Sequence, residues 1–200
     1  MAVPEYYPGT RVYVNLLNLR NAGKLETAEA FFSAKRDHEF YEDPDSVVVI
    51  PSVDRFSLKH LCRIHHHQFQ DVYGWAGKVR TFRSRKNFLR EFSLPEDIER
   101  FAESIQKDIV EDELLYAGNM QQATERLAHY MSMINIMHPF AEGNGRSQRA
   151  FIWLLAQDAG YNILWQSISK EIIHAGAIRL MRDADKGGIE HLLESIIEKS

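Results

Sequence analysis

Residues 138–149 read His-Pro-Phe-Ala-Glu-Gly-Asn-Gly-Arg-Ser-Gln-Arg, and this motif segment dominates the interpretation of the chain. It brings together a histidine, an acid, two glycines, an amide and two arginines. Gly143 and Gly145 permit positive φ and close backbone approach, so successive N–H groups can form an anion nest where the next helix begins. The dipole of that helix adds attraction for negative charge. The segment therefore predicts a phosphate site.

Each charged residue of the motif segment has a chemical role at such a site. Arg146 and Arg149 share a helix face, where their planar guanidinium groups can hold two phosphates. Glu142 would repel phosphate unless a cation intervened, which predicts a Mg²⁺ ligand completed by phosphate oxygens and water. His138, with an ordinary pKa of about 6.5, can take a proton from an attacking hydroxyl. The grouping indicates phosphoryl or nucleotidyl transfer, and the absence of a Gly-x-x-x-x-Gly-Lys-Ser/Thr motif disfavours P-loop GTPases and ATPases.

Helical periodicity extends outward from the motif segment in both directions. Helices are predicted at residues 24–38, 57–72, 93–113, 121–137, 146–159, 170–182 and 189–197. Ser93 and Glu96 have the spacing of a capping box with Pro95 in the first turn, and Gly160 occupies the C′ position expected after a helix. The run His65-His66-His67 does not predict a metal site, because consecutive helical side chains point about 100° apart.

Residues 78–92 have a different pattern, in which β-formers alternate with basic residues up to the pair Lys86-Asn87. This alternation predicts a short hairpin. Its basic residues either form a solvated face or serve recognition; they are Arg80, Arg83, Arg85, Lys86 and Arg90.

Composition predicts one compact domain, since 200 residues with 44% apolar and 26% charged side chains can bury a sizeable core. We expect residues 1–52 to be an N-terminal extension packed on a core formed by residues 53–200. A net charge of −4 and a pI near 6.1 argue against a surface that seeks nucleic acid or anionic lipid. The single Cys62, with no leader or apolar stretch of membrane-spanning length, predicts a cytoplasmic protein.

The motif segment matches every defined position of the Fic-domain signature, His-x-Phe-x-Asp/Glu-Gly-Asn-Gly-Arg-x-x-Arg. The likeness extends through Ile64-His65, the run Tyr-Gly-Trp-Ala-Gly-Lys-Val-Arg at residues 73–80, and Ala159-Gly160-Tyr161. The chain therefore resembles the Fic family over roughly residues 56–182, with the first fifty residues and the last helix weakly matched.

The resemblance implies an all-α fold, a helical bundle with a small β-hairpin flap, and protein adenylylation, the transfer of AMP from ATP to a Ser, Thr or Tyr hydroxyl. It implies that His138 is the general base and that Glu142 holds Mg²⁺. It assigns the α- and β-phosphates to Gly143, Asn144 and Gly145, and the β/γ end to Arg146 and Arg149. It also places Lys86 and Asn87 at the nucleotide-facing tip of the flap, and Gln166 near the adenine.

The resemblance further implies partners. A target protein would lie along the flap at residues 78–92, and bacterial type II topoisomerase subunits are targets of such relatives. Many Fic proteins carry an inhibitory Ser/Thr-x-x-x-Glu-Gly/Asn motif, but the spacing occurs here only at Ser167 and Glu171, where Ile172 replaces the last residue. We therefore expect a toxin whose inhibitory glutamate comes from a small antitoxin acting on Arg149.

Two alternatives stay open at this level. A phosphotransferase of the Doc type would bind ATP reversed and transfer the γ-phosphate, but such relatives carry Lys where this chain has Gly145. A catalytically idle nucleotide-binding module is disfavoured by the intact His138, Glu142 and Arg149.

Overall fold

The computed structural model describes residues 4–84, 91–183, 185 and 187–200, which form two compact units. The first unit contains the described residues up to Thr81 together with Phe140–Ser147. The second contains the described residues of Phe82–Pro139 and Gln148–Ser200. The N-terminal residues that the sequence pattern separates at residue 52 thus share a unit with the centre of the motif segment; the predicted boundary itself stays a prediction.

The first unit is built on two long helices joined by short turns. Its elements are α1 (Ala22–Glu42), α2 (Pro44–Val47), the 3₁₀ turn η1 (Ser52–Asp54) and α3 (Leu58–Phe69). Helix α1 begins where the Asn21 side chain accepts from the Lys24 N–H, and α3 begins where Ser57 accepts from the His60 N–H. These two caps satisfy N–H groups that a helix start leaves without partners.

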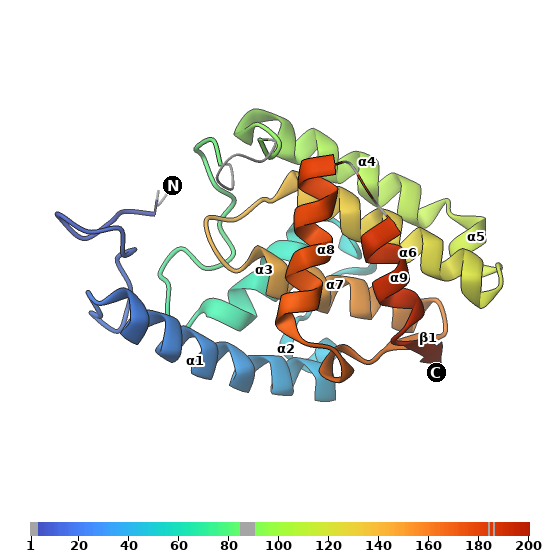
Figure 1. Ribbon diagram of the computed structural model, residues 1–200, viewed down its shortest axis with the longest axis horizontal. Coiled ribbons are helices and arrows are strands. Elements are labelled where there is room, and N and C mark those ends of the chain that lie inside the picture. The colour runs from blue at the N-terminus through green and yellow to red at the C-terminus, as the bar shows by residue number, and fades with distance from the viewer. Residues whose placement is uncertain (1–3, 85–90, 184, 186) are drawn as a thin grey trace. The chain divides into compact units, whose positions relative to one another are not determined.

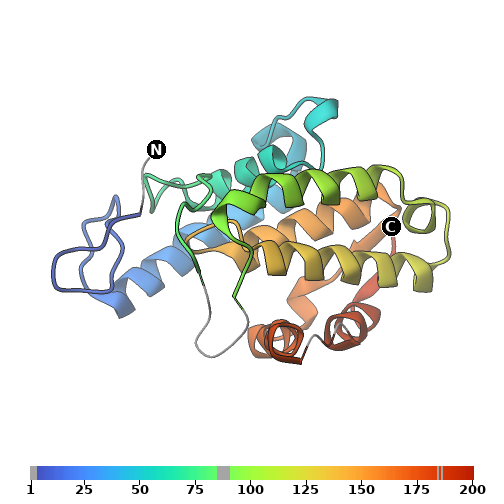
Figure 2. The same cartoon turned by 90° about the horizontal axis from the view of Figure 1, so that it is seen from above.

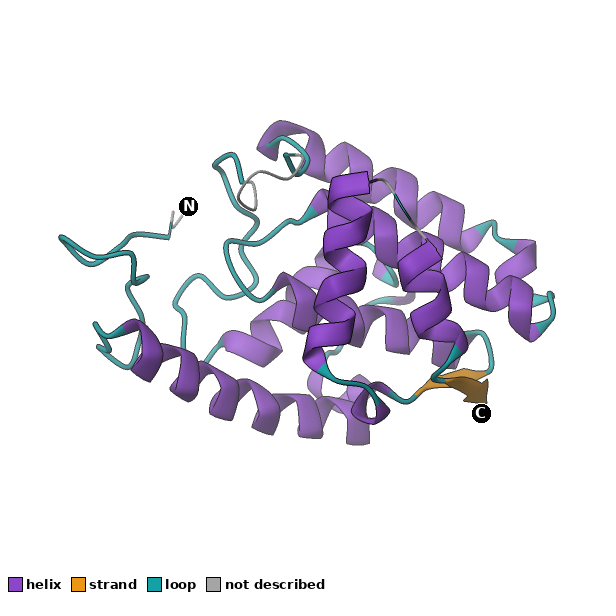
Figure 3. Cartoon of the chain, in the orientation of Figure 1, coloured by secondary structure: helices purple, strands orange, loops and turns teal. Residues whose placement is uncertain are grey.

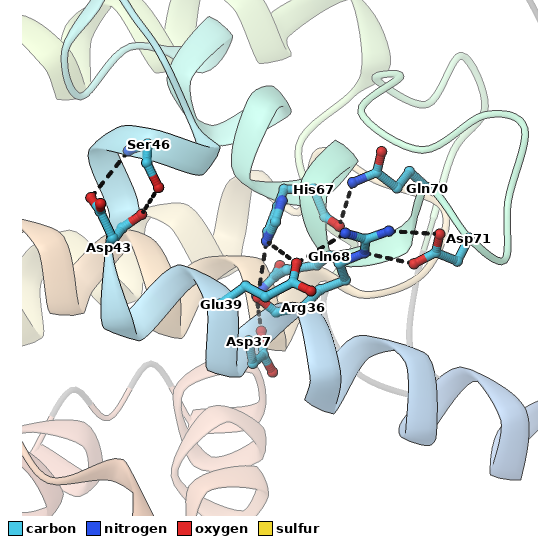
Figure 4. Close-up of polar contacts among 9 residues, drawn as sticks. All are labelled: Arg36, Asp37, Glu39, Asp43, Ser46, His67, Gln68, Gln70 and Asp71. Carbon is cyan, nitrogen blue, oxygen red and sulfur yellow. Dashed lines mark hydrogen bonds and ion pairs between the residues drawn. The ribbon is translucent and has the colours of Figure 1, made fainter.

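A polar network joins α1 to α3 in the first unit (Figure 4). Arg36 donates to both carboxylate oxygens of Asp71, at 2.7 and 2.9 Å. The Gln68 amide donates to Asp37 at 2.7 Å. The Arg36 guanidinium holds the pKa of Asp71 below its ordinary value. The network fixes the register of α3 on α1, and α3 in turn carries residues that contact the motif segment.

An aromatic core completes the first unit around the end of α3. Its buried members are Tyr7, Val12, Leu25, Phe69, Val72, Tyr73, Trp75 and Ala76. Ala141 of the motif segment packs against this cluster. The Leu16 N–H donates to the Val72 carbonyl at 2.8 Å, which fastens the N-terminal segment beside the core.

The second unit is organised around α6, which packs against α4, α5, α8 and α9. Its helical elements are η2 (Pro95–Asp97), α4 (Ile98–Val110), α5 (Glu113–Tyr116), α6 (Met120–Met137), η3 (Trp165–Ser167), α8 (Lys170–Asp183) and α9 (Gly187–Glu194). Helix α7 (Asn144–Asp158) begins in the first unit and continues into the second. Helices α8 and α9 lie side by side (Figure 1), as do α4 and α6 (Figure 2).

A buried carboxylate fixes the corner between α4 and α6. Asp112 accepts from Arg126 Nε and from the Tyr130 hydroxyl, each at 2.5 Å, while its other oxygen caps α5 at the Leu115 N–H. Burial alone would raise the pKa of Asp112, but these hydrogen bonds outweigh it and lower the pKa. The carboxylate therefore stays charged and paired inside the unit.

The strands of the described residues form one antiparallel pair, β1 (Tyr161–Ile163) with β2 (Ile197–Lys199) (Figure 3). In this pair, Tyr161 lies opposite Lys199. The last predicted helix, at residues 189–197, is therefore too long: α9 ends at Glu194, and Ile197 begins the strand β2. The predicted flap is described at its base only, where the Phe92 N–H donates to the Ser84 carbonyl at 3.2 Å. Its predicted tip, with Lys86 and Asn87, lies outside the described residues.

The predicted capping box at Ser93 is wrong. Within the described part of the chain no side chain caps η2 or α4, and α4 begins only at Ile98. Ser93 instead donates from its N–H, at 3.0 Å, and from its hydroxyl, at 3.4 Å, to the Ile136 carbonyl. A capping box does occur at Asn119 and Gln122, where α6 begins. Ser93 thus satisfies a carbonyl at the end of one helix and does not start another.

Among the helices of the described segments, none combines the length and the apolar character that crossing a membrane requires.

Candidate functional site

The motif segment is divided between the two units. Phe140–Ser147 belongs to the first unit, whereas His138 and Arg149 belong to the second. His138 ends α6, and the residues from Asn144 onward form the first turns of α7. The segment is thus a helix–loop–helix connection, as the predicted helices on either side required.

His65 of α3 holds the loop through both ring nitrogens. The Gly77 N–H donates to His65 Nδ1 at 2.8 Å, so the ring proton lies on Nε2, which donates to the Glu142 carbonyl at 3.0 Å. The imidazole is fully buried and stacks on Phe140 with ring centroids 3.9 Å apart. Burial lowers the pKa of His65 to about 3. The ring is therefore neutral, with one tautomer fixed by its two partners.

Asn144 closes the loop with its side chain. Its Oδ1 accepts from the Phe140 N–H at 2.9 Å and its Nδ2 donates to the Phe140 carbonyl at 2.8 Å. This amide is occupied within the loop, so any contact between Asn144 and a bound anion falls to its backbone. The first N–H groups of a helix lack intrahelical acceptors, and α7 presents such a terminus at Asn144.

Gly143 is the position where the loop requires glycine. Its φ is +79°, and a Cβ there would lie 2.4 Å from ring atoms of Phe69. Of the two glycines that permit positive φ, Gly143 adopts it, whereas Gly145 lies in the first turn of α7. The backbone thus makes its close approach to Phe69 and turns into the helix one residue later.

Glu142 is exposed, and one of its carboxylate oxygens accepts from the Gly143 N–H at 2.9 Å. A carboxylate has further lone pairs on both oxygens. Within the described residues, no group of three or more His, Cys, Asp or Glu side chains forms a metal cage. Magnesium is commonly held by one or two carboxylates together with phosphate oxygens and water, and Glu142 fits that mode of binding.

Arg146 is held by α1 and α3. One terminal nitrogen donates to the Ser33 hydroxyl at 2.8 Å and the other to the Glu29 carboxylate. The guanidinium carbon lies 4.5 Å from the centroid of the Phe69 ring. Glu29 is buried and also accepts from the Tyr73 hydroxyl. The first arginine of the motif is therefore a positive charge fixed in place by the N-terminal helix.

In the second unit, His138 has an unusual backbone. Its φ of 45° and ψ of 62° are left-handed, and its N–H donates to the Ile134 carbonyl at the end of α6. A non-glycine residue with positive φ that also precedes proline is strained, and such strain concentrates at functional positions. The imidazole stacks on Phe92 with centroids 3.7 Å apart and an interplanar angle of 5°.

Arg149 and Gln166 both belong to the second unit. The Trp165 indole N–H donates to the Arg149 carbonyl at 3.2 Å, which seats the turn η3 on α7. Gln166 is the next residue of that turn and is exposed. The turn that carries Gln166 is thus joined to α7 at Arg149, and the predicted nucleotide contacts of both residues stay predictions.

The three consecutive histidines face three different carbonyls, as helical spacing predicts. His65 contacts that of Glu142, His66 Nδ1 lies 3.2 Å from that of Ala76, and His67 Nε2 lies 2.9 Å from that of Arg36. Of the predicted basic cluster, Arg80 is buried and does not belong to a solvated face, whereas Arg83 is exposed.

Sequence reasoning missed Glu29 and Phe92. A signal for Glu29 exists, because the buried residues of α1 are Leu25, Glu29, Ser33 and Phe40, a stripe on which two polar residues interrupt apolar positions. Phe92 carries no comparable signal, since the sequence shows only an aromatic residue in an extended segment.

Comparison with known proteins places these observations in a family. Residues 55–156 match the model of the Fic/DOC family. The chain is 35% identical over 168 residues to protein adenylyltransferase VbhT of Bartonella schoenbuchensis, covering 84% of this chain and 34% of that protein. This chain thus corresponds to about a third of VbhT. It is also 34% identical over 168 residues to the probable protein adenylyltransferase Fic of Salmonella typhimurium, covering 84% of this chain and 79% of that protein.

Solved structures agree in fold. The BepC protein of Bartonella tribocorum, determined with bound AMPPNP, superposes with a TM-score of 0.88 at 22% identity, covering 98% of this chain and 96% of that chain. The fold prediction, an all-α Fic bundle with a small β-hairpin, is confirmed as a mostly helical Fic fold with one two-stranded antiparallel pair among the described residues, which β1 and β2 form.

Acid should weaken the fold through His65. Its folded pKa is about 3, whereas the unfolded value is about 6.5. Below pH 6.5 the unfolded chain therefore binds more protons than the folded chain. The contribution of His65 to the free energy of unfolding is complete above that pH and falls by up to about 1.4 kcal/mol per pH unit below it. Urea unfolding between pH 6.5 and 5 measures how the free energy of unfolding changes with pH. That slope should be smaller in His65→Phe by this amount. His38→Gln, which alters a side chain 72% exposed, should keep the slope, and an unchanged slope in His65→Phe contradicts the assignment.

Gly143→Ala should destabilise more than Gly160→Ala. Both residues have positive φ, but a Cβ at Gly160 meets nothing within 4 Å. Backbone strain should cost about 1–2 kcal/mol in either variant, and the Phe69 clash should add about 1–3 kcal/mol to Gly143→Ala. Urea unfolding measures both. In a Phe69→Leu background the two losses in the free energy of unfolding should become more similar, because the clashing ring is gone. If Gly143→Ala and Gly160→Ala cost the same in both backgrounds, the packing constraint at Gly143 is refuted.

Proposed function

Because this chain belongs to the Fic/DOC family, we propose that it is a protein adenylyltransferase that transfers AMP from ATP to a Ser, Thr or Tyr hydroxyl and releases pyrophosphate. The observation that carries the proposal is the complete motif segment on a buried frame. His65, Asn144 and Phe69 hold its loop in one conformation, and α7 begins directly behind it.

The proposed chemistry follows from this chain's own groups. His138 accepts the proton of the target hydroxyl as that oxygen bonds to the α-phosphorus and the bond to the β-phosphate oxygen breaks. The backbone at Gly143, Asn144 and Gly145, together with the start of α7, binds the α- and β-phosphates. Arg149 faces the leaving pyrophosphate, and Arg146 adds fixed positive charge. Preorganised charge of this kind supplies much of the rate enhancement in many enzymes.

Glu142 would hold Mg²⁺ together with phosphate oxygens and water. Bound there, the metal would neutralise phosphate charge and polarise the reacting phosphorus. Gln166 is proposed to contact the adenine, and Lys86 and Asn87 to contact the nucleotide from the flap. A target protein would add an extended segment along residues 78–92 by β-augmentation.

Labelled ATP tests the reaction. Incubation with a bacterial lysate and ATP labelled on the α-phosphate should transfer label to protein, whereas the γ-labelled nucleotide should not. His138→Ala should lose about 100-fold or more of the rate, since a general base contributes about that much, while calorimetry shows ATP binding retained. Label from the γ position alone would indicate a phosphotransferase, and label from neither position an idle binding module. Topoisomerase subunits are the first labelled bands to identify.

We further propose that this chain is a toxin and that a second protein, an antitoxin, inhibits it by supplying a glutamate to Arg149. Its support is the absence of a complete inhibitory motif in the sequence. Within this chain, Glu29 is the candidate for an internal inhibitory glutamate, because it pairs with Arg146. Glu29→Gln should therefore leave transfer by the isolated chain equal to or below the unmodified rate, because it loosens Arg146. A rise of several-fold in the α-label assay would place the restraint within this chain and refute the partner. Glu26→Gln, an exposed change on the same helix, is the matched control.

A further inference from the structure

We propose that Phe92 is a positioning residue that sets the orientation of the His138 imidazole and couples it to the flap. The inference rests on the proposed role of His138 as base. Phe92 lies at the C-terminal base of residues 78–92, and nothing in the motif segment itself identifies it.

The stacking geometry constrains the imidazole plane. The two rings are 3.7 Å apart at their centroids and 5° from parallel, and Phe92 is only 7% exposed. A ring face at van der Waals distance prevents the imidazole from turning about χ2, since that rotation would drive its ring atoms into the phenyl group. Phe92 therefore selects the plane in which the histidine nitrogens lie.

The His138 backbone makes such support necessary. Its left-handed conformation before Pro139 is disfavoured, and strained conformations persist only where surrounding contacts over-determine them. The hydrogen bond from the His138 N–H to the Ile134 carbonyl fixes the main chain. The Phe92 ring contacts the side chain, which that backbone bond does not reach.

Phe92 and its neighbour also connect this histidine to the flap. The Phe92 N–H donates to the Ser84 carbonyl across the flap base, and the Ser93 N–H donates to the Ile136 carbonyl, two residues before His138. The backbone of Phe92 thus belongs to the flap, while its ring contacts His138, the proposed general base. A target segment bound along residues 78–92 would therefore act on the imidazole through Phe92.

The stacking itself is tested by proton NMR of the full chain. The His138 ring protons, assigned by their loss in His138→Ala, should lie upfield of the exposed His38 ring protons, because the phenyl ring current shields nuclei above its face. They should move downfield in Phe92→Leu. This readout needs no enzymatic activity, so it separates failure of the inference from failure of the proposed function. Unshifted protons in the unmodified chain overturn the inference.

Kinetics test the consequence with α-labelled ATP and bacterial lysate. Phe92→Leu should lower the rate at saturating ATP by about 10- to 100-fold, since a misplacement of about 1 Å can cost that much, and leave the KM for ATP within about twofold. Phe92→Tyr should restore at least half of the rate because it keeps the ring face. Phe92→Met, which fills the space without a ring, should behave like Phe92→Leu.

Ile109→Ala is the control for lost stability, because Ile109 is fully buried on α4 but lies at the opposite end of that helix from Ser93. It should change the rate by less than twofold below its unfolding temperature. Equal losses in Phe92→Tyr and Phe92→Leu, or a normal rate in Phe92→Leu, would refute the positioning role. An unmodified chain that transfers no label, with shielded His138 protons, would refute the proposed function and leave the stacking intact.

Discussion

The hydrogen bonds at the two nitrogens of His65 are the interaction on which the candidate site depends. One nitrogen accepts from the Gly77 N–H and the other donates to the Glu142 carbonyl, so a single ring joins the segment after α3 to the motif loop. An imidazole can serve both an N–H and a C=O at once only when it is neutral. Burial enforces that neutrality. The loop conformation is thus set by a side chain outside the motif, and Glu142 owes its position to a residue that the proposed mechanism does not use.

The N-terminal helix has a comparable importance. Glu29 places a buried carboxylate against Arg146, and the Tyr73 hydroxyl shares that carboxylate. Removing one partner of such a pair leaves a charge without compensation in a low-dielectric setting, which is more damaging than never having had the pair. Helix α1 therefore supports the motif segment through Arg146, although it lies far from that segment in sequence. A family model that begins at residue 55 does not include this contribution.

Much of the fold could be predicted from sequence, because periodicity and helix-end signals are local. The helices beside the motif segment begin and end within a few residues of their predicted limits, and Gly160 takes the positive φ expected of a C′ residue. Long-range partners could not be predicted. Ser93 has the spacing of a cap, yet its N–H and hydroxyl both serve the Ile136 carbonyl. Arg80 is one of a basic series in the sequence, but tertiary packing buries it. The site residues of the motif follow from chemistry, whereas their supports, His65, Glu29 and Phe92, follow only from the three-dimensional arrangement.

The bonds between Asn144 and Phe140 have one further consequence, which concerns chemical durability. Asn-Gly is the dipeptide most prone to deamidation, a reaction in which the glycine backbone nitrogen attacks the asparagine side-chain carbonyl and forms a succinimide. In this loop both polar atoms of the Asn144 amide are held by the Phe140 backbone, and Gly145 is already helical. The cyclic intermediate needs the amide to turn away from those partners and the helix to open. The hydrogen bonds between Asn144 and Phe140 therefore also protect the loop from deamidation, for as long as the first turn of α7 stays folded.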